Sequence, residues 1–217
     1  MTAAEPLRPD LARELIDRAA RAAARRAKRL RNQLDAVQLG QDRHADHADT
    51  RILRRVLAEH DWPGHRLVGA EAARAAWSLA LHADDDDDLQ RAATTLLERA
   101  VHDGDARVQH WAHLYDRTLV NSDRPQEFGT QQAVTATGVE LHPVRAPESL
   151  DQRRASVGLS PIATALETVR RRLTQDHQAG DSMTVVLAKV ARPSEPHPLH
   201  RAAAPTNPPH MKRTVAV

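Results

Sequence analysis

Apolar residues recur every three or four positions over much of the chain, the spacing that puts side chains on one face of an α-helix. The first such stripe covers residues 10–37 and consists of Leu11, Leu15, Ala19, Ala23, Ala27, Leu30, Leu34 and Val37. We expect one long helix there, with a narrow apolar face because its middle is alanine. Residues 39–48 are polar and break the pattern, so a linker is expected.

The centre of the chain, residues 61–131, is expected to hold the main core. All three tryptophans and the only tyrosine and phenylalanine lie within it, and aromatic side chains dominate core energetics. Residues 70–81 are apolar on nearly every side, which is typical of a buried helix. A helix that precedes residues 61–131 should end at His60. Two helices that follow the 70–81 helix, joined at Gly104, should form an antiparallel hairpin.

Acidic residues mark several expected helix starts. Asp46 or Asp49 can cap the helix that ends at His60, and Asp105 can cap the second helix of the hairpin. The acidic run at residues 84–88 favours a helix start because carboxylates stabilise the partial positive charge there.

The C-terminal part is expected to be less regular. A short hairpin is predicted around residues 134–141, followed by helices over residues 148–157 and from Pro161, and a strand over residues 183–190. Six of the 13 prolines follow residue 192, which predicts a disordered tail. The expected fold is a mainly α, bundle-like domain with one small β-hairpin. The expected division is a basic helical arm and linker (1–40), a helical core (41–175) and a mostly disordered tail (176–217).

Composition excludes several classes of function. The chain has 217 residues, a formal net charge of +2 and no cysteine, so thiolate catalysis and cysteine-based metal sites are excluded. No apolar run approaches the roughly 18 residues of a membrane span, and no secretory signal is recognised, so we expect a soluble cytoplasmic protein with no membrane partner. The abundance of alanine and arginine suggests a bacterial source.

One segment is strongly basic. Arg18–Arg31 carries six arginines and one lysine without an acid. It could contact phosphate or an acidic partner, or it could be a solvated helix face. No aromatic residues interleave for base stacking, so a nucleic-acid partner is not favoured.

Familiar catalytic and metal-binding motifs are absent. There is no GxSxG elbow and no phosphate-cradling glycine loop, so nucleotide-dependent chemistry is disfavoured and no cofactor is expected. His110 and His113 share a helix face, and a third metal ligand would have to come from His82 or Asp84. No metal site is predicted.

The candidate site is a set of polar residues at helix ends. His82 and Asp84 follow the buried helix, and Asp116 and Arg117 lie near the end of the last hairpin helix. These two helices should run parallel in a bundle, so their ends should meet at one pole. The full set of ligand-binding candidates is His82, Asp84, Asp116, Arg117, Gln126, Thr130 and Gln131.

Two interpretations of this set remain open. The first is a pocket in which His82 acts as acid/base or hydrogen-bond donor and Arg117 holds an anion. The second is that these groups satisfy helix ends. In either case His82 should be partly buried and hydrogen-bonded to Asp84, Asp116 or a residue of the 126–131 loop.

Three classes of function follow. A module that binds a small ligand or peptide, with a regulatory role as one option, is favoured. The alternatives are a hydrolase that uses His82 with Asp84 or Asp116, and a nucleic-acid-associated protein acting through Arg18–Arg31. Enzyme activity is left open, and the expected partner is a small ligand or another protein.

A series of short motifs resembles a bacterial domain family of unknown function. Members of that family read D-x-x-N-T, H-G-W-P, V-G, Q-H-A-D, D-R, R-P-Q-x-Y-G-T-Q and R-R-x-x-G-L, and the resemblance spans about residues 46–162. The chain departs from the series at Asp49 (asparagine in the family), Asp61 (glycine), Leu81 (glutamine) and Phe128 (tyrosine). The resemblance implies no activity.

Overall fold

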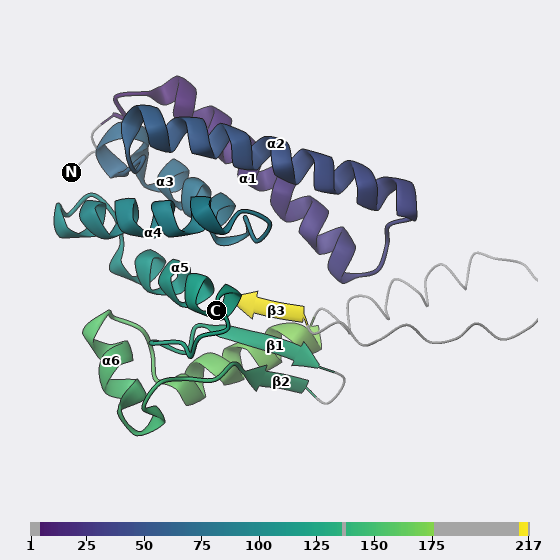
Figure 1. The fold of residues 1–217 in the computed structure, drawn as a ribbon, viewed down its shortest axis with the longest axis vertical. Helices are drawn as coiled ribbons and strands as arrows, with labels where there is room; N and C mark the ends of the chain where they lie inside the picture. Colours follow the sequence, from purple (N-terminus) through teal and green to yellow (C-terminus); the bar gives the residue numbers. More distant parts are fainter. Residues whose placement is uncertain (1–4, 136–137, 176–212, 217) are drawn as a thin grey trace, which may run out of the picture.

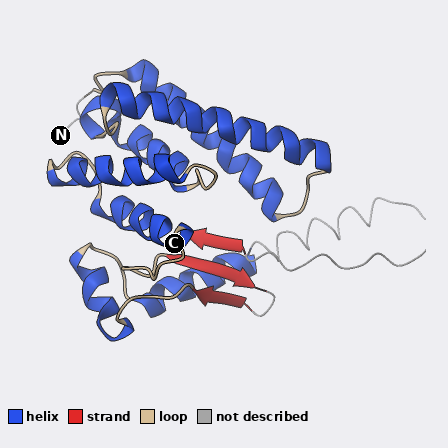
Figure 2. Ribbon diagram, in the orientation of Figure 1, coloured by secondary structure: helices blue, strands red, loops and turns tan. Residues whose placement is uncertain are grey.

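The chain is mainly α-helical, as predicted, with one small sheet (Figures 1 and 2). The structure, a computed structural model, describes residues 5–135, 138–175 and 213–216. Helices α1 and α2 lie at one side, α3 and α4 follow, and α5 separates them from the sheet and α6 (Figure 1). None of the described helices combines the length and apolar content needed to cross a bilayer.

The first two helices form a hairpin, α1 (Pro9–Leu30) and α2 (Ala36–His60). The prediction of one helix over residues 10–37 and a linker over 39–48 was therefore wrong. Asn32 has a positive φ of 54°, which ends α1. Asp35 and Gln38 then form a reciprocal capping box that starts α2.

Asp46 and Asp49 consequently lie inside α2 and do not cap it. The end of α2 at His60 agrees with the prediction. The stripe of this helix faces the core, since Leu53, Val56 and Leu57 are buried.

The central helices are α3 (His65–Leu81), α4 (Asp87–His102) and α5 (Val108–Asn121). Helix α3 begins before the predicted residue 70 and is kinked at Gly69, whose φ is 80°. Asp105 does not cap α5. Its carboxylate accepts from Arg66 N at 2.8 Å, and its carbonyl accepts from His65 N at 2.9 Å, so Asp105 fixes the start of α3.

The sheet contains the predicted hairpin, β1 (Gln131–Thr135) and β2 (Gly138–Leu141), which pair antiparallel. Strand β3 (Arg213–Ala216) pairs with the other edge of β1, giving the order β2-β1-β3. The short helices η1 (Pro147–Ser149) and α6 (Leu150–Ser156) follow the hairpin, and a further helix covers residues 162–175. The predicted strand at 183–190 and most of the predicted tail lie outside the described residues.

Two apolar clusters lie on opposite sides of α5. The larger joins α1 to α5 and extends beyond residues 61–131, because Leu11, Leu15 and Ala22 of α1 belong to it. The smaller contains Ala112, Phe128 and Val157, with Trp111 and Tyr115 packed against it. Helix α5 thus connects the helical layers to the sheet, and its C-terminal end lies where both can contribute polar groups.

Candidate functional site

The ends of α3 and α5 meet, as their predicted parallel course requires. Arg117 holds the Asp84 carboxylate with two nitrogens, Nε at 2.8 Å from Oδ1 and Nη2 on Oδ2. Asn121 donates to Asp84 at 3.1 Å and to Gln90 at 2.8 Å. Burial opposes ionisation of Asp84, but the hydrogen bond and charge of Arg117 bring its pKa below the ordinary value.

Asp116 is fully buried beneath the loop that leads into β1. Its oxygens accept hydrogen bonds from the backbone N–H groups of Glu127 (2.8 Å), Phe128 (3.0 Å) and Thr130 (2.9 Å), and from the Thr130 hydroxyl (3.0 Å). Burial raises the pKa of Asp116, and these hydrogen bonds counteract that rise. With this many donors already bound, Asp116 holds the loop in place and has no free face for a ligand.

Arg154 of α6 binds the same loop from its other side. Its Nη1 donates to the carbonyls of Phe128 at 2.6 Å and Gly129 at 3.3 Å, and its Nε donates to the Ser160 carbonyl at 2.6 Å. The loop therefore has N–H groups on Asp116 and carbonyls on Arg154.

The predicted loop residues complete this arrangement. Gln126 accepts from Gln131 N at 2.7 Å and donates to the carbonyls of Gln131 and His142, both at 3.0 Å. Gln131 in turn donates to the His113 carbonyl at 3.2 Å. We call Asp116, Gln126, Thr130, Gln131 and Arg154 the loop network; all are at most 2% exposed.

His82 lies outside the loop network, although it follows the same helix as Asp84. Its side chain is half-buried, as predicted. The predicted hydrogen bond was wrong: among the described residues, the His82 ring has no hydrogen-bond partner. It lines a cavity together with polar residues of α1 and α2, which the sequence analysis did not place near His82.

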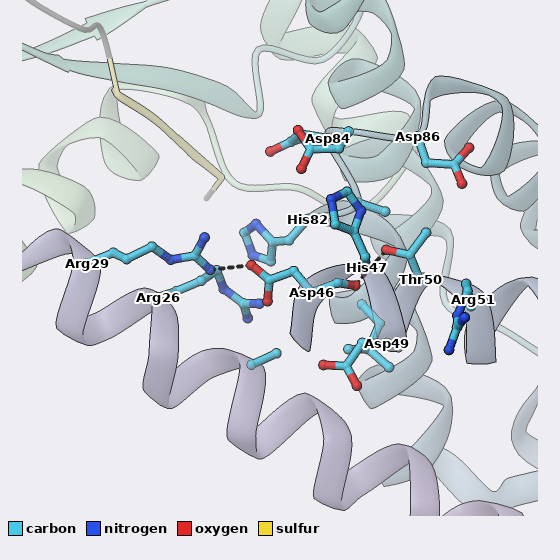
Figure 3. A pocket seen from close by; sticks show the side chains of 14 residues that line it. Arg26, Arg29, Asp46, His47, Asp49, Thr50, Arg51, His82, Asp84 and Asp86 are labelled. Carbon is cyan, nitrogen blue, oxygen red and sulfur yellow. Dashed lines mark hydrogen bonds and ion pairs between the residues drawn. The ribbon is translucent and has the colours of Figure 1, made fainter. Parts of the chain in front are cut away.

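This cavity, about 400 Å³ in volume, is bounded by α1, α2, the end of α3 and the turn before α4. We call it the α1–α3 cavity. Figure 3 shows His82 and His47 between the arginines of α1 and the acidic turn that contains Asp84 and Asp86. The labelled polar lining residues are Arg26, Arg29, Asp46, His47, Asp49, Thr50, Arg51, His82, Asp84 and Asp86.

Most arginines of α1 that face α2 are neutralised there. Arg25 lies 2.9 Å from Asp46 and 2.6 Å from Asp49, and Arg29 lies 2.7 Å from Asp46. Arg18 lies 3.0 Å from Asp49. These ion pairs join the two helices. They also neutralise three of the arginines in the basic segment that was considered as a contact for phosphate.

Arg26 is the exception. Its Nη2 donates to the Ser78 hydroxyl at 3.3 Å, and within the described ranges it forms no ion pair. Burial lowers the pKa of Arg26. The negative charge of Asp46 opposes this shift, and the positive charges of Arg29 and Arg25 add to it. The sequence analysis missed this residue, because nothing in a run of arginines indicates which one lacks a carboxylate.

Burial and nearby positive charges keep His82 neutral. Burial lowers the pKa of His82 to about 3, and the positive charges of Arg26 and Arg117 contribute. A neutral imidazole has one donor and one acceptor nitrogen. His82 can therefore either donate to or accept from a molecule in the cavity.

The acidic turn supplies the opposite wall. Asp84 is bound by Arg117, while Asp86 accepts from Leu89 N at 3.0 Å and is paired with Arg54. Asp85 also lines the cavity; it is exposed, and no side-chain partner for it lies among the described residues.

His110 and His113, which share a helix face, pack against an aromatic ring. His110 stacks on Trp77 with ring centroids 4.4 Å apart, and His113 meets the edge of the same ring at 5.9 Å. In the part of the chain that the structure describes, no three His, Asp or Glu side chains are grouped to hold a metal ion. This pair belongs to the packing between α3 and α5.

Comparison with known proteins identifies the family only. No curated protein and no solved structure matches the chain significantly. The model of the family of unknown function DUF6624 matches residues 9–176, which include every described helix from α1 to α6 and both strands of the hairpin. The chain therefore belongs to the DUF6624 family.

Proposed function

We propose that the protein is a helical module that binds a small polar ligand in the α1–α3 cavity. One observation carries this proposal: Arg26 and His82 present polar nitrogens at the cavity with little or no hydrogen bonding to the rest of the described chain. Both side chains are half-buried at the wall of the cavity. A ligand that enters the cavity can therefore reach these nitrogens and supply their hydrogen-bond partners.

The dimensions of the cavity fit this role. Ligand pockets occupy roughly 300–1,000 Å³, and this cavity lies near the lower limit at about 400 Å³. Its walls come from α1, α2 and the end of α3, so the site depends on the folded tertiary structure. A small molecule fits this space better than a long peptide does.

The alternatives have less support. A hydrolase that pairs His82 with Asp116 would need a free carboxylate, and Asp116 is bound by the 127–130 loop. The Thr50 hydroxyl, a candidate nucleophile in the cavity, donates to the Asp46 carbonyl at 3.0 Å. A nucleic-acid partner would have to compete with the carboxylates that neutralise Arg18, Arg25 and Arg29.

Filling the cavity tests the proposal. Thr50→Phe places a large ring at the cavity wall, whereas Thr95→Phe makes the same change on the exposed side of α4. Both threonines donate to a carbonyl one turn earlier, at 3.0 Å and 3.2 Å, so the pair is matched. In a ligand-observed NMR screen of small polar compounds, binders of the wild-type protein should be lost with Thr50→Phe and retained with Thr95→Phe. Binders that tolerate Thr50→Phe equally well would contradict the proposal.

A further inference from the structure

The charges around the α1–α3 cavity are separated into two walls. Arg26 and Arg29 approach from α1, and Asp84–Asp86 form the turn on the other side (Figure 3). We infer that the ligand is a small zwitterion whose oxyanion contacts Arg26 and whose ammonium group faces Asp85. This inference rests on the proposed cavity site and adds the chemical class of its ligand.

The oxyanion end follows from the state of Arg26. A guanidinium offers five N–H donors, and among the described residues Arg26 donates one hydrogen bond, to the neutral hydroxyl of Ser78. The adjacent Arg25 and Arg29 are matched by carboxylates of α2. A phosphate or carboxylate group is the partner that a guanidinium binds best, because two parallel charge-assisted hydrogen bonds can form.

His82 suits the same group. Its ring lies between the arginines and the acidic turn (Figure 3), and it is uncharged because burial and the nearby arginines oppose protonation. A bound oxyanion would bring negative charge next to the imidazole, which favours the protonated form. Binding of the oxyanion should therefore raise the pKa of His82, a signal specific to this position.

The ammonium end follows from the acidic turn. Asp84 and Asp86 are paired with Arg117 and Arg54, whereas Asp85 lines the cavity without a described partner. Two unpaired charges of opposite sign at one cavity favour a ligand with both charges. They also disfavour polyanions, because a second phosphate would lie against the carboxylates.

Three probes of similar size separate the two ends. Phosphoethanolamine carries both charges, ethyl phosphate lacks the ammonium group, and ethanolamine lacks the phosphate. Binding to the full chain is measured by NMR titration of the His82 imidazole at pH 7. We expect phosphoethanolamine to bind most tightly, ethyl phosphate to bind more weakly, and ethanolamine to shift no His82 signal at the same concentrations.

Matched variants assign each end to a residue. Arg26→Met should weaken both phosphate probes by about tenfold or more, since a charge-assisted interaction is lost. Arg21→Met, an exposed arginine on α1, should leave binding within twofold. Asp85→Asn should make phosphoethanolamine and ethyl phosphate bind equally, whereas Asp87→Asn, in the same acidic run, should preserve the difference. Thermal melting of every variant confirms that it remains folded, and Arg26→Lys should retain part of the affinity.

The outcomes distinguish the inference from the proposed function. If the phosphate probes fail to bind but compounds of another class bind and are lost with Thr50→Phe, the cavity is a ligand site and the zwitterion inference is wrong. If ethyl phosphate binds as tightly as phosphoethanolamine to the wild-type protein, the inferred contact between the ammonium group and Asp85 is wrong. If Arg26→Met and Arg21→Met weaken binding equally, Arg26 is not the anchor. Probe binding that Thr50→Phe leaves unchanged would overturn both proposals.

Discussion

Two arginines, Arg154 which is buried and Arg26 which is half-buried, show how the loop network differs from the α1–α3 cavity. Arg154 and Arg26 both have pKa values lowered by burial, and within the described ranges neither forms an ion pair. Arg154 donates to three backbone carbonyls, whereas Arg26 donates to one hydroxyl among the described residues. The side-chain type is the same, but the number of partners differs. That number distinguishes a group that organises the fold from one that can bind a ligand.

The two regions also use their acids differently. Asp116 receives the N–H groups of a loop that has no other way to satisfy them, and so the shape of the 127–130 segment depends on it. Asp85 at the cavity is exposed, and its side chain has no partner among the described residues. The predictions below test this difference, beginning with the residue whose loss should matter most.

Removal of the Asp116 carboxylate should have the largest effect. Asp116→Ala leaves three loop N–H groups and the Thr130 hydroxyl without an acceptor. Each buried donor left without an acceptor costs about 1–3 kcal/mol, so we expect a loss of about 3–5 kcal/mol in the free energy of unfolding, measured by urea denaturation. Asp116→Asn keeps one acceptor oxygen and should lose less. A loss below about 1 kcal/mol for the alanine variant would show that the loop keeps its conformation without the Asp116 carboxylate.

The next largest effect should be a difference in stability between variants of the two arginines. Arg154→Met leaves the carbonyls of Phe128, Gly129 and Ser160 without their donor and should lower the free energy of unfolding by about 2–4 kcal/mol, since each buried unsatisfied group costs about 1–3 kcal/mol. Arg26→Met removes one hydrogen bond and a poorly compensated charge, so its stability should change by less than about 1 kcal/mol. Equal losses for the two variants would remove the distinction between the regions.

The sequence predicted some helix boundaries correctly and missed others. Local sequence signals correctly placed the end of α2, the acidic start of α4 and the hairpin at Gly104, because these features depend on neighbours within a few residues. The break between α1 and α2 was missed because Leu34 and Val37 continue the apolar spacing. The capping pair Asp35 and Gln38 was the available signal.

The candidate site was predictable only in part. The meeting of Asp84 with Arg117, and of Asp116 with the 126–131 loop, followed from two parallel helices that end together. The direction of the His82 ring and the role of Arg26 depend on α1 packing along α3. That contact joins residues far apart in the sequence, and no local pattern specifies it.

Acid should destabilise the protein through histidines in both regions. Burial lowers the pKa of His113 from 6.5 to about 4, with help from the charges of His110 and Arg154. Between pH 6.5 and 4 the unfolded chain therefore binds more protons than the folded chain, and the free energy of unfolding falls as pH decreases. The maximum slope is about 1.4 kcal/mol per pH unit for each such histidine.

Variants assign this slope to its sources. His113→Gln should flatten the dependence by about 1 kcal/mol per unit between pH 6 and 4.5, and His82→Gln should flatten it as well. A cavity ligand with an oxyanion should reduce only the His82 part, because it favours the charged imidazole there. Denaturation curves at several pH values, with and without phosphoethanolamine, measure both contributions. A wild-type slope that neither variant changes would show that these rings do not have the lowered pKa values that their burial implies.

The smallest effects should come from two neighbouring acids at the cavity. Asp84→Asn weakens the two-nitrogen contact with Arg117 and the bond from Asn121, so we expect a loss of about 1 kcal/mol, the usual net value of a hydrogen-bonded pair. Asp85→Asn changes an exposed carboxylate without a described partner and should stay within about 0.5 kcal/mol, as surface substitutions usually do. Thermal melts of the two variants compare these two losses of stability. A larger loss at Asp85 than at Asp84 would mean that the acidic turn is held through its exposed residue, and Asp85 would then be part of the architecture and not a group available to a ligand.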